Sequence, residues 1–175
     1  MPGNAFIKFE GVTEGESTHE SHPGSSGWNE INDWSFTASA DTSFLKGSGA
    51  AVGKPVPEAI SVSKPFDKAS PVIMKKLIQG TSFTKVYLVM LKQTGAEDGK
   101  GEVYFAMTFQ DVFITKVDNK GGEDGGVTQD IEFVCKTMAT GYKPQKNTGG
   151  LDAAIELGWD ISKMKIDDSG LKPAF

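Results

Sequence analysis

The sequence predicts a mainly β fold in which one short helix covers the open end or face of a β barrel. Two observations lead to this fold class. Short runs of alternating apolar and polar residues recur along the chain, and Gly, Pro, Ser and Asp bound them, as is typical of strands joined by turns. One segment has helical periodicity instead. A length of 175 residues suits a single domain, residues 1–175, with a core that needs no disulfide or metal.

The predicted strands follow one another in chain order. The early ones are short, at residues 6–9, 28–36 and 60–66. Three longer runs follow, "SFTKVYLVMLKQ", "EVYFAMTFQDVFITKV" and "TQDIEFVCKTMATGY". Because the acidic, glycine-rich turns "TGAEDGKG" and "DNKGGEDGG" separate them, we expect two long hairpins. In the last predicted strand, Ile155, Leu157, Trp159 and Ile161 alternate with polar residues or glycine.

The segment "ASPVIMKKLIQG" predicts a helix of about ten residues, at positions about 70–79. Ser70 is a good N-cap, Pro71 suits the first helical position, and Gly80 can adopt the left-handed conformation that ends a helix. The apolar residues fall on one predicted stripe: Ile73, Met74, Leu77 and Ile78.

The charge of the chain argues against nucleic acid as a partner. The net charge is −5, and the sequence contains no arginine. Nucleic-acid binding relies on positive charge, and base and phosphate recognition favours the bidentate guanidinium. We therefore expect no nucleic-acid partner.

The sequence also predicts a soluble cytoplasmic product without membrane insertion. Its first ten residues lack the basic and apolar regions of a signal peptide, and its longest apolar run, Val86–Leu91, is too short to span a bilayer. Cys135 is the only cysteine, so an intramolecular disulfide is impossible. Because it continues the alternation of Ile131 and Phe133, we expect a buried, inert thiol.

A search for catalytic or metal-binding groups predicts that the protein is not an enzyme and has no cofactor. His19 and His22 could share a metal with Glu16 or Glu20, but no third nitrogen or sulfur ligand accompanies them. A solvated loop is the favoured interpretation. The acidic turns lack the ligand spacing of an EF-hand, and carboxylates on flexible glycine turns are poorly placed for acid–base catalysis.

The stretch "KGSGAAVGKP" superficially resembles a phosphate-binding loop. In that motif the first glycine would stand at Ser48 and the metal-binding hydroxyl at Pro55. Pro55 also lacks an N–H group and disfavours helix at Lys54. A nucleotide site is therefore not expected here.

Four motifs in their chain order resemble the haemolysin-coregulated protein (Hcp) family of type VI secretion systems. They are "GES" at 15–17, "SKPFDKASP" at 63–71, "YKPQ" at 142–145 and "GW" at 158–159. The resemblance covers nearly the whole chain. Two positions depart from the family pattern: "TQD" stands at 128–130 where many relatives have Thr-Glu, and the usual arginine after the "VYLVML" strand is absent.

The resemblance implies a two-sheet antiparallel β barrel that assembles as a homohexameric ring. Such rings stack into the inner tube of the secretion system, which a contractile sheath propels outward. Further implied partners are the spike and baseplate proteins, and effector proteins in the ring lumen. The resemblance also implies that the protein is cytoplasmic when assembled and reaches the extracellular space or a target cell without a cleaved signal peptide.

In the family, a long loop between the second and third strands reaches a neighbouring protomer. Here it spans about residues 40–57, and we expect it to lack secondary structure of its own. The predicted interface residues are Phe44, Leu45, Lys46, Gly53 and Lys54. Phe44 and Leu45 are the expected apolar anchors, and Lys46 and Lys54 could meet a carboxylate across the interface.

Two other functions remain open from sequence. A monomeric β-sandwich module could bind carbohydrate through a platform made by Trp28, Trp34 and Trp159. The tail-tube proteins of contractile phages share the architecture implied by the resemblance.

Overall fold

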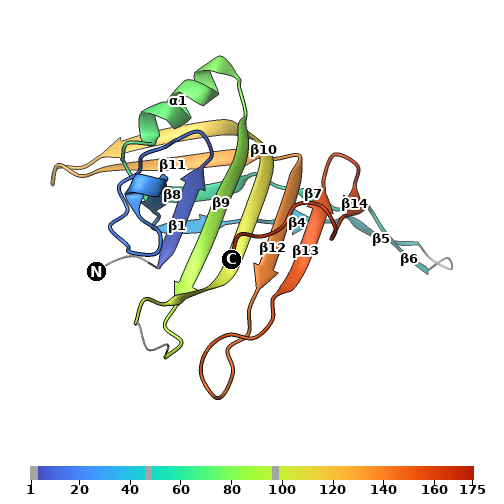
Figure 1. The fold of residues 1–175 in the computed structure, drawn as a ribbon. Coiled ribbons are helices and arrows are strands. Elements are labelled where there is room, and N and C mark those ends of the chain that lie inside the picture. Colours follow the sequence, from blue (N-terminus) through green and yellow to red (C-terminus); the bar gives the residue numbers. More distant parts are fainter. Residues whose placement is uncertain (1–3, 46–48, 96–98) are drawn as a thin grey trace.

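The computed structural model describes residues 4–45, 49–95 and 99–175, and Figure 1 shows the ribbon. Strands dominate it, which confirms the predicted mainly β class. In chain order the elements are β1 (Ala5–Phe9), the 3-10 turn η1 (Gly24–Ser26), β2 (Trp28–Glu30), β3 (Asp33–Ser35), β4 (Ala38–Ser39), β5 (Thr42–Leu45), β6 (Gly49–Val52), β7 (Val56–Pro57), β8 (Ile60–Pro65), α1 (Ser70–Gln79), β9 (Phe83–Lys92), β10 (Glu102–Gly121), β11 (Val127–Val134), β12 (Thr137–Tyr142), β13 (Ile155–Asp160) and β14 (Lys165–Ile166).

Antiparallel pairing arranges the main strands as two sheets around one core. The first sheet has the order β2-β1-β9-β10-β12-β13-β14, and the second has the order β10-β11-β8-β3. Strand β10 belongs to both sheets because it is 20 residues long. Its first half pairs with β9 and β12, and its second half pairs with β11.

The two sheets meet at a corner in β10. Asp111 has a positive φ of 54°, which is uncommon for a residue other than glycine. Phe113 on one side of it pairs with Val134, and Gln110 on the other side pairs with Thr137. The register of the pairing with β10 is therefore the same on both sides of the bend, where β11 ends and β12 begins opposite Asp111. The sequence predicted this run as one unbroken strand, whereas the structure interrupts it at 135–136, where the sheet changes direction.

A second corner lies on the other side of the barrel. The N–H of Ile31 donates to the carbonyl of Ala5 in the first sheet, and the N–H of Asn32 donates to that of Ser63 in the second. The predicted strand at 28–36 is thus two short strands, β2 and β3, one in each sheet. Counted as one bent strand, they complete a circuit of pairings through β8, β11, β10, β9 and β1.

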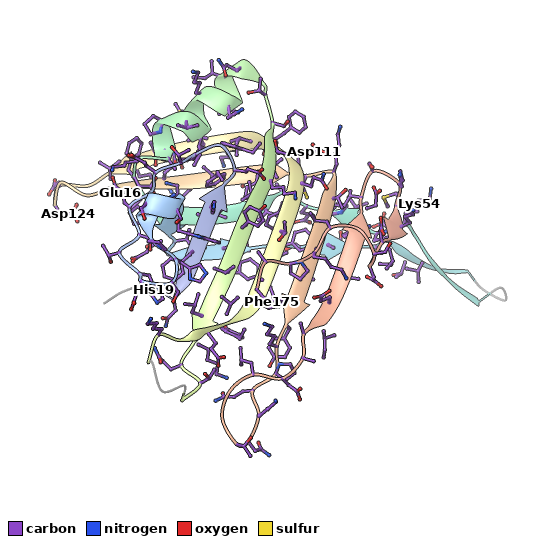
Figure 2. The ribbon with its side chains drawn as sticks, in the orientation of Figure 1. Glu16, His19, Lys54, Asp111, Asp124 and Phe175 are labelled. Carbon is purple, nitrogen blue, oxygen red and sulfur yellow. The ribbon has the colours of Figure 1, made fainter. Side chains whose placement is uncertain are left out.

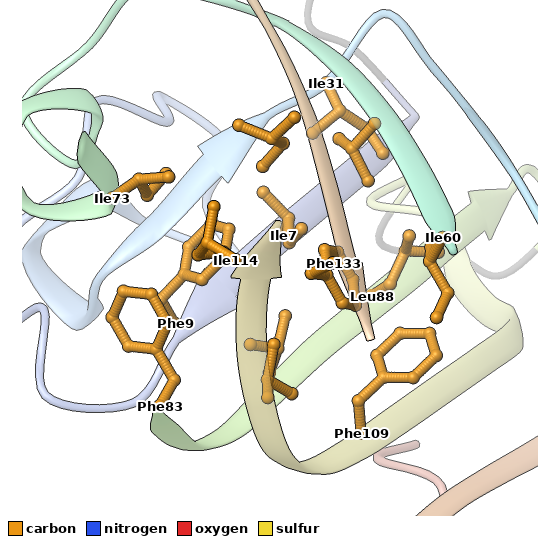
Figure 3. Packing of buried hydrophobic residues seen from close by; sticks show 14 of the residues in the cluster. Ile7, Phe9, Ile31, Ile60, Ile73, Phe83, Leu88, Phe109, Ile114 and Phe133 are labelled. Atoms are coloured by element: carbon orange, nitrogen blue, oxygen red, sulfur yellow. The ribbon is translucent and has the colours of Figure 1, made fainter. Parts of the chain in front are cut away.

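The space between the sheets is filled by apolar side chains (Figure 3). Two aromatic pairs anchor it, Phe109 with Phe133 and Phe9 with Phe83, each with ring centroids 5.1 Å apart. Burial of such side chains is the main force that holds the two sheets together. Further members of this cluster are Ile7, Ile31, Ile60, Ile73, Leu88 and Ile114.

Helix α1 has the predicted bounds but not the predicted details. Ala69 is its N-cap and Ser70 its first helical residue. The Ser70 hydroxyl accepts hydrogen bonds from Lys64 and from the N–H of Asp67. Ile73 is fully buried, whereas Ile78 is 77% exposed. At 100° per residue, Ile78 lies about 140° around the helix from Ile73. The predicted stripe is therefore wrong at this position.

Strands β12 and β13 extend beyond the barrel as a wing of the first sheet. The C-terminal segment crosses one face of this wing, with Phe175 in front of it (Figure 2). Two glycines allow the close approach. A side chain at Gly141 would collide with the Phe175 ring, and one at Gly158 would overlap the carbonyl oxygen of Asp167.

Candidate assembly surface

The long segment between β3 and β8 projects from the barrel as an arm (Figure 1). Its base is the pair β4–β7, and its outer part is the hairpin β5–β6, in which Thr42 pairs with Val52 and Leu45 with Gly49. The expectation of a loop without secondary structure is therefore wrong. Backbone pairing between the two sides satisfies the N–H and C=O groups that an irregular excursion would leave to water.

The predicted interface residues lie along this arm. Phe44 is in β5, where its backbone pairs with Ala50. Lys46 lies outside the described residues. The N–H of Gly53 donates to the carbonyl of Asp41, 2.6 Å away, and holds the base of the hairpin. Lys54 follows it and is exposed.

An apolar trough opens where the arm leaves the barrel, between the wing and the chain that follows β3. Trp34 stacks on Phe105 with ring centroids 5.3 Å apart, and its indole N–H points to the sulfur of Met90 at 3.2 Å. The hollow measures about 300 Å³, and its other lining residues include Phe36, Met107, Met138, Leu157 and Trp159. None of its lining residues carries a charge.

A second hollow of about 310 Å³ continues the trough along the wing. The two share Phe105, Thr140 and Leu157. At its outer end Ile155 is 68% exposed, and Tyr142 is also exposed. The predicted alternation of Ile155 and Leu157 is thus real, but it marks an uncovered face and not the core. Sequence reasoning missed this surface because alternation does not say what covers the apolar side.

The three tryptophans do not form one platform. Trp34 and Trp159 both line the trough. Trp28 belongs to a different cluster, where its ring lies edge-on to His22 at 4.7 Å. The alternative of a carbohydrate platform made by all three residues is therefore not supported.

His19 and His22 are half-buried, so the prediction of a solvated loop is wrong for them. Both rings contact the buried ring of Phe6, at centroid distances of 5.1 and 5.4 Å. Burial and, secondarily, the neighbouring His19 lower the pKa of His22, which favours the neutral ring. Among the described residues, no group of three or more His, Cys, Asp or Glu side chains is placed to hold a metal.

The strand-to-helix junction "SKPFDKASP" contains a buried ion pair. The ammonium group of Lys64 donates to Asp67 Oδ1 and to Ser70 Oγ, both at 2.8 Å. Asp67 Oδ1 also accepts the N–H of Ala69 at 3.0 Å. Burial lowers the pKa of Lys64, although Asp67 opposes this shift. The pair fixes the turn through which β8 enters α1.

The outer face of the second sheet carries charges of both signs around a hollow of about 390 Å³. Lys120 bridges Asp130 at 2.9 Å and Asp118 at 3.5 Å. The hydrogen bond between Lys120 and Asp130 raises the pKa of the lysine and lowers that of the aspartate. Lys120 thus reaches Asp118 on its own strand β10 and Asp130 on β11, and it offsets one of the two negative charges.

Cys135 lies at the bend between β11 and β12 and is half-buried. Desolvation raises the pKa of its thiol to about 12. The group is therefore a thiol at neutral pH, and a thiol is a poor nucleophile.

Comparison with known proteins places this fold. A family model described as "Type VI secretion system effector, Hcp" matches residues 6–142. The chain belongs to the Hcp family. The expectation drawn from its motifs is confirmed, and membership supports a tube protein of a type VI secretion system. A search of curated proteins gives no significant match.

Solved structures with the same fold include other Hcp proteins. One titled "Structure of a type six secretion system protein" is 24% identical and has a TM-score of 0.82, with 93% of this chain and 98% of that chain covered. Hcp1 from Salmonella typhimurium is also 24% identical, with a TM-score of 0.73 and coverage of 95% and 100%. The cap that terminates the tube of the anti-feeding prophage is 12% identical, with a TM-score of 0.51 and coverage of 79% and 88%.

Among the residues that the structure describes, no helix combines the length and apolar character needed to cross a membrane.

Proposed function

We propose that this protein is the structural unit of a type VI secretion tube. Six copies of its single domain, residues 1–175, associate by lateral sheet pairing into a ring, and rings stack into a tube inside a contractile sheath. The observation that carries the proposal is the match of residues 6–142 to the Hcp family. The projecting arm supports it, because a two-stranded ribbon is marginal alone and needs a partner surface.

The tube leaves the cell when the sheath contracts, together with its spike, while the baseplate anchors the assembly. The protein is therefore cytoplasmic when assembled and extracellular afterwards, without a cleaved signal peptide. Effector proteins travel in the ring lumen. Its role is structural and needs no catalytic group or cofactor.

The arm is the contact that we assign to assembly, through Phe44, Leu45, Lys46, Gly53 and Lys54. Each apolar anchor should contribute about 1.5–3 kcal/mol per contact. Six copies of a chain with net charge −5 give a ring of about −30 (6 × −5), so rings repel one another and added salt should promote their stacking.

Two measurements test the proposal. Light scattering should give the mass of six protomers, and a monomer at high concentration and moderate salt would contradict the ring. Sedimentation across a salt series should then show less stacking for Phe44→Ser with Leu45→Ser than for wild type. Ile78→Ser is the matched control, because it removes an exposed apolar side chain from α1. Circular dichroism should show β structure in all three proteins, and equal stacking would exclude the arm.

A further inference from the structure

The trough is one end of the barrel, and a second apolar surface lies at the other. Along the second sheet, β3 and β11 both reach the arm end, because Ser35 pairs with Ser61, and Ile60 with Phe133. The opposite end is formed by Phe66 and Val127, joined by a hydrogen bond from the N–H of Phe66 to the carbonyl of Val127. Phe133 lies six residues after Val127 in β11, or about 20 Å along the strand.

Both ends expose large apolar side chains. Phe66 is 41% exposed and Val127 is 46% exposed, at the end beside the β10–β11 turn. Leu157 is 44% exposed in the concave trough. Contiguous apolar surface that is left exposed marks an interaction site.

The charges at the two ends are complementary. The β10–β11 turn carries Glu123 and Asp124, both exposed, and Figure 2 shows Asp124 at the tip of this hairpin. Lys54 is exposed on the arm, on the opposite side of the molecule in the same view. Within the described part of the chain, neither Lys54 nor Glu123 takes part in an ion pair.

We infer that the trough of one copy receives the Phe66–Val127 end of the next copy, with Lys54 facing the turn at Glu123 and Asp124. The occupant is a second copy because this chain itself carries both matching surfaces. The surfaces differ, so the contact is heterologous and leaves one free end of each kind until a ring closes. The inference rests on the proposed ring and adds a contact between these two surfaces to its lateral sheet pairing.

Cross-linking tests the contact directly. Within one chain, Leu157 pairs with Thr140 of β12, and Thr140 pairs with Met107 of β10. Val127 pairs with Gly121, which lies fourteen residues further along β10 (121 − 107). That is about 45 Å of strand contour, bent at the corner. The double variant Val127→Cys with Leu157→Cys, treated with a short bis-maleimide, should therefore link different chains and give a ladder ending at six. Each single variant is a control for links that involve the native Cys135, because it retains Cys135 but carries only one of the two introduced cysteines.

A charge exchange tests the polar part of the contact. Lys54→Glu should require an about tenfold higher protein concentration for half-assembly at low salt, because it places like charges together. Glu123→Lys with Asp124→Lys should have a similar effect. Combining all three changes should restore assembly to near the wild-type concentration. Light scattering over a dilution series measures the concentration for half-assembly of each variant.

The outcomes separate this inference from the proposed function. Six-membered rings that give no ladder and no rescue would overturn the assigned surfaces and leave the ring intact. A chain that is monomeric at every concentration would overturn both. A ladder together with charge rescue would establish the contact.

Discussion

The buried pair Lys64–Asp67 gives the sharpest prediction about stability. The Lys64 side chain is fully buried, and that of Asp67 is 6% exposed. Replacing Asp67 by alanine removes the carboxylate that accepts hydrogen bonds from Lys64, Ala69 and Ser70. The lysine would then keep only Ser70 Oγ at 2.8 Å and the carbonyl of Pro65 at 3.3 Å.

The expected cost is about 3–5 kcal/mol, since breaking a buried pair leaves one charge uncompensated. The part of this cost that comes from the uncompensated charge has an upper bound set by the lysine itself. Releasing its proton at pH 7 costs about 4.6 kcal/mol from an ordinary pKa near 10.4, and a neutral Lys64 escapes further penalty. Replacing both residues, Lys64→Met with Asp67→Ala, should recover most of the loss, because no buried charge remains.

The pH dependence has a defined sign. Burial already lowers the pKa of Lys64, and loss of Asp67 should lower it further. The unfolded state then binds more protons than the folded state, from the lowered pKa up to about 10.4. In this window the free energy of unfolding of Asp67→Ala should rise with pH, by up to about 1.4 kcal/mol per unit.

Urea denaturation at pH 7, 8 and 9 measures both effects, at several protein concentrations so that assembly is seen separately. The matched control is Asp130→Ala, which breaks the exposed pair Lys120–Asp130 at the same kind of distance, 2.9 Å. That change should cost about 1 kcal/mol or less. If Asp67→Ala costs no more than the control and shows no pH dependence, the buried pair does not hold the junction.

Three further predictions concern single positions. His22→Phe should reduce the loss of stability below about pH 6.5. The pKa of His22 is lowered in the folded state, so the unfolded state takes up the proton first as the pH falls and is favoured. Denaturation at pH 7.5 and 5.5 compares the change in the free energy of unfolding for wild type and variant. Ile73→Ala should cost about 2–5 kcal/mol and Ile78→Ala less than about 1 kcal/mol, since only the former is buried; equal melting shifts would contradict the helix orientation. Gly158→Ala should displace the C-terminal segment at Asp167, which limited proteolysis would detect as faster tail cleavage.

The sequence alone was enough to predict the class, the helix bounds and the family. Strand alternation at Phe6–Phe9 and Ile60–Pro65 and the helix end at Gly80 are local signals, and the structure follows them. Local signals suffice because side chains that alternate, or that recur every three or four residues, must share a face whatever the rest of the chain does.

The features that the sequence did not predict depend on contacts between distant segments of the chain. Whether Ile78 or Leu157 is covered depends on which element arrives above it, and no neighbouring residue encodes that. The stacking of His22 on Phe6 and the bend at Asp111 likewise follow from how the sheets close. Lys64 and Asp67 are only three residues apart in the sequence, yet the pair becomes buried only when α1 and β11 pack around the junction. There the side chain of Gln129 donates a hydrogen bond to the carbonyl of Ser70. Burial is a property of the assembled core, so only the tertiary structure could decide it.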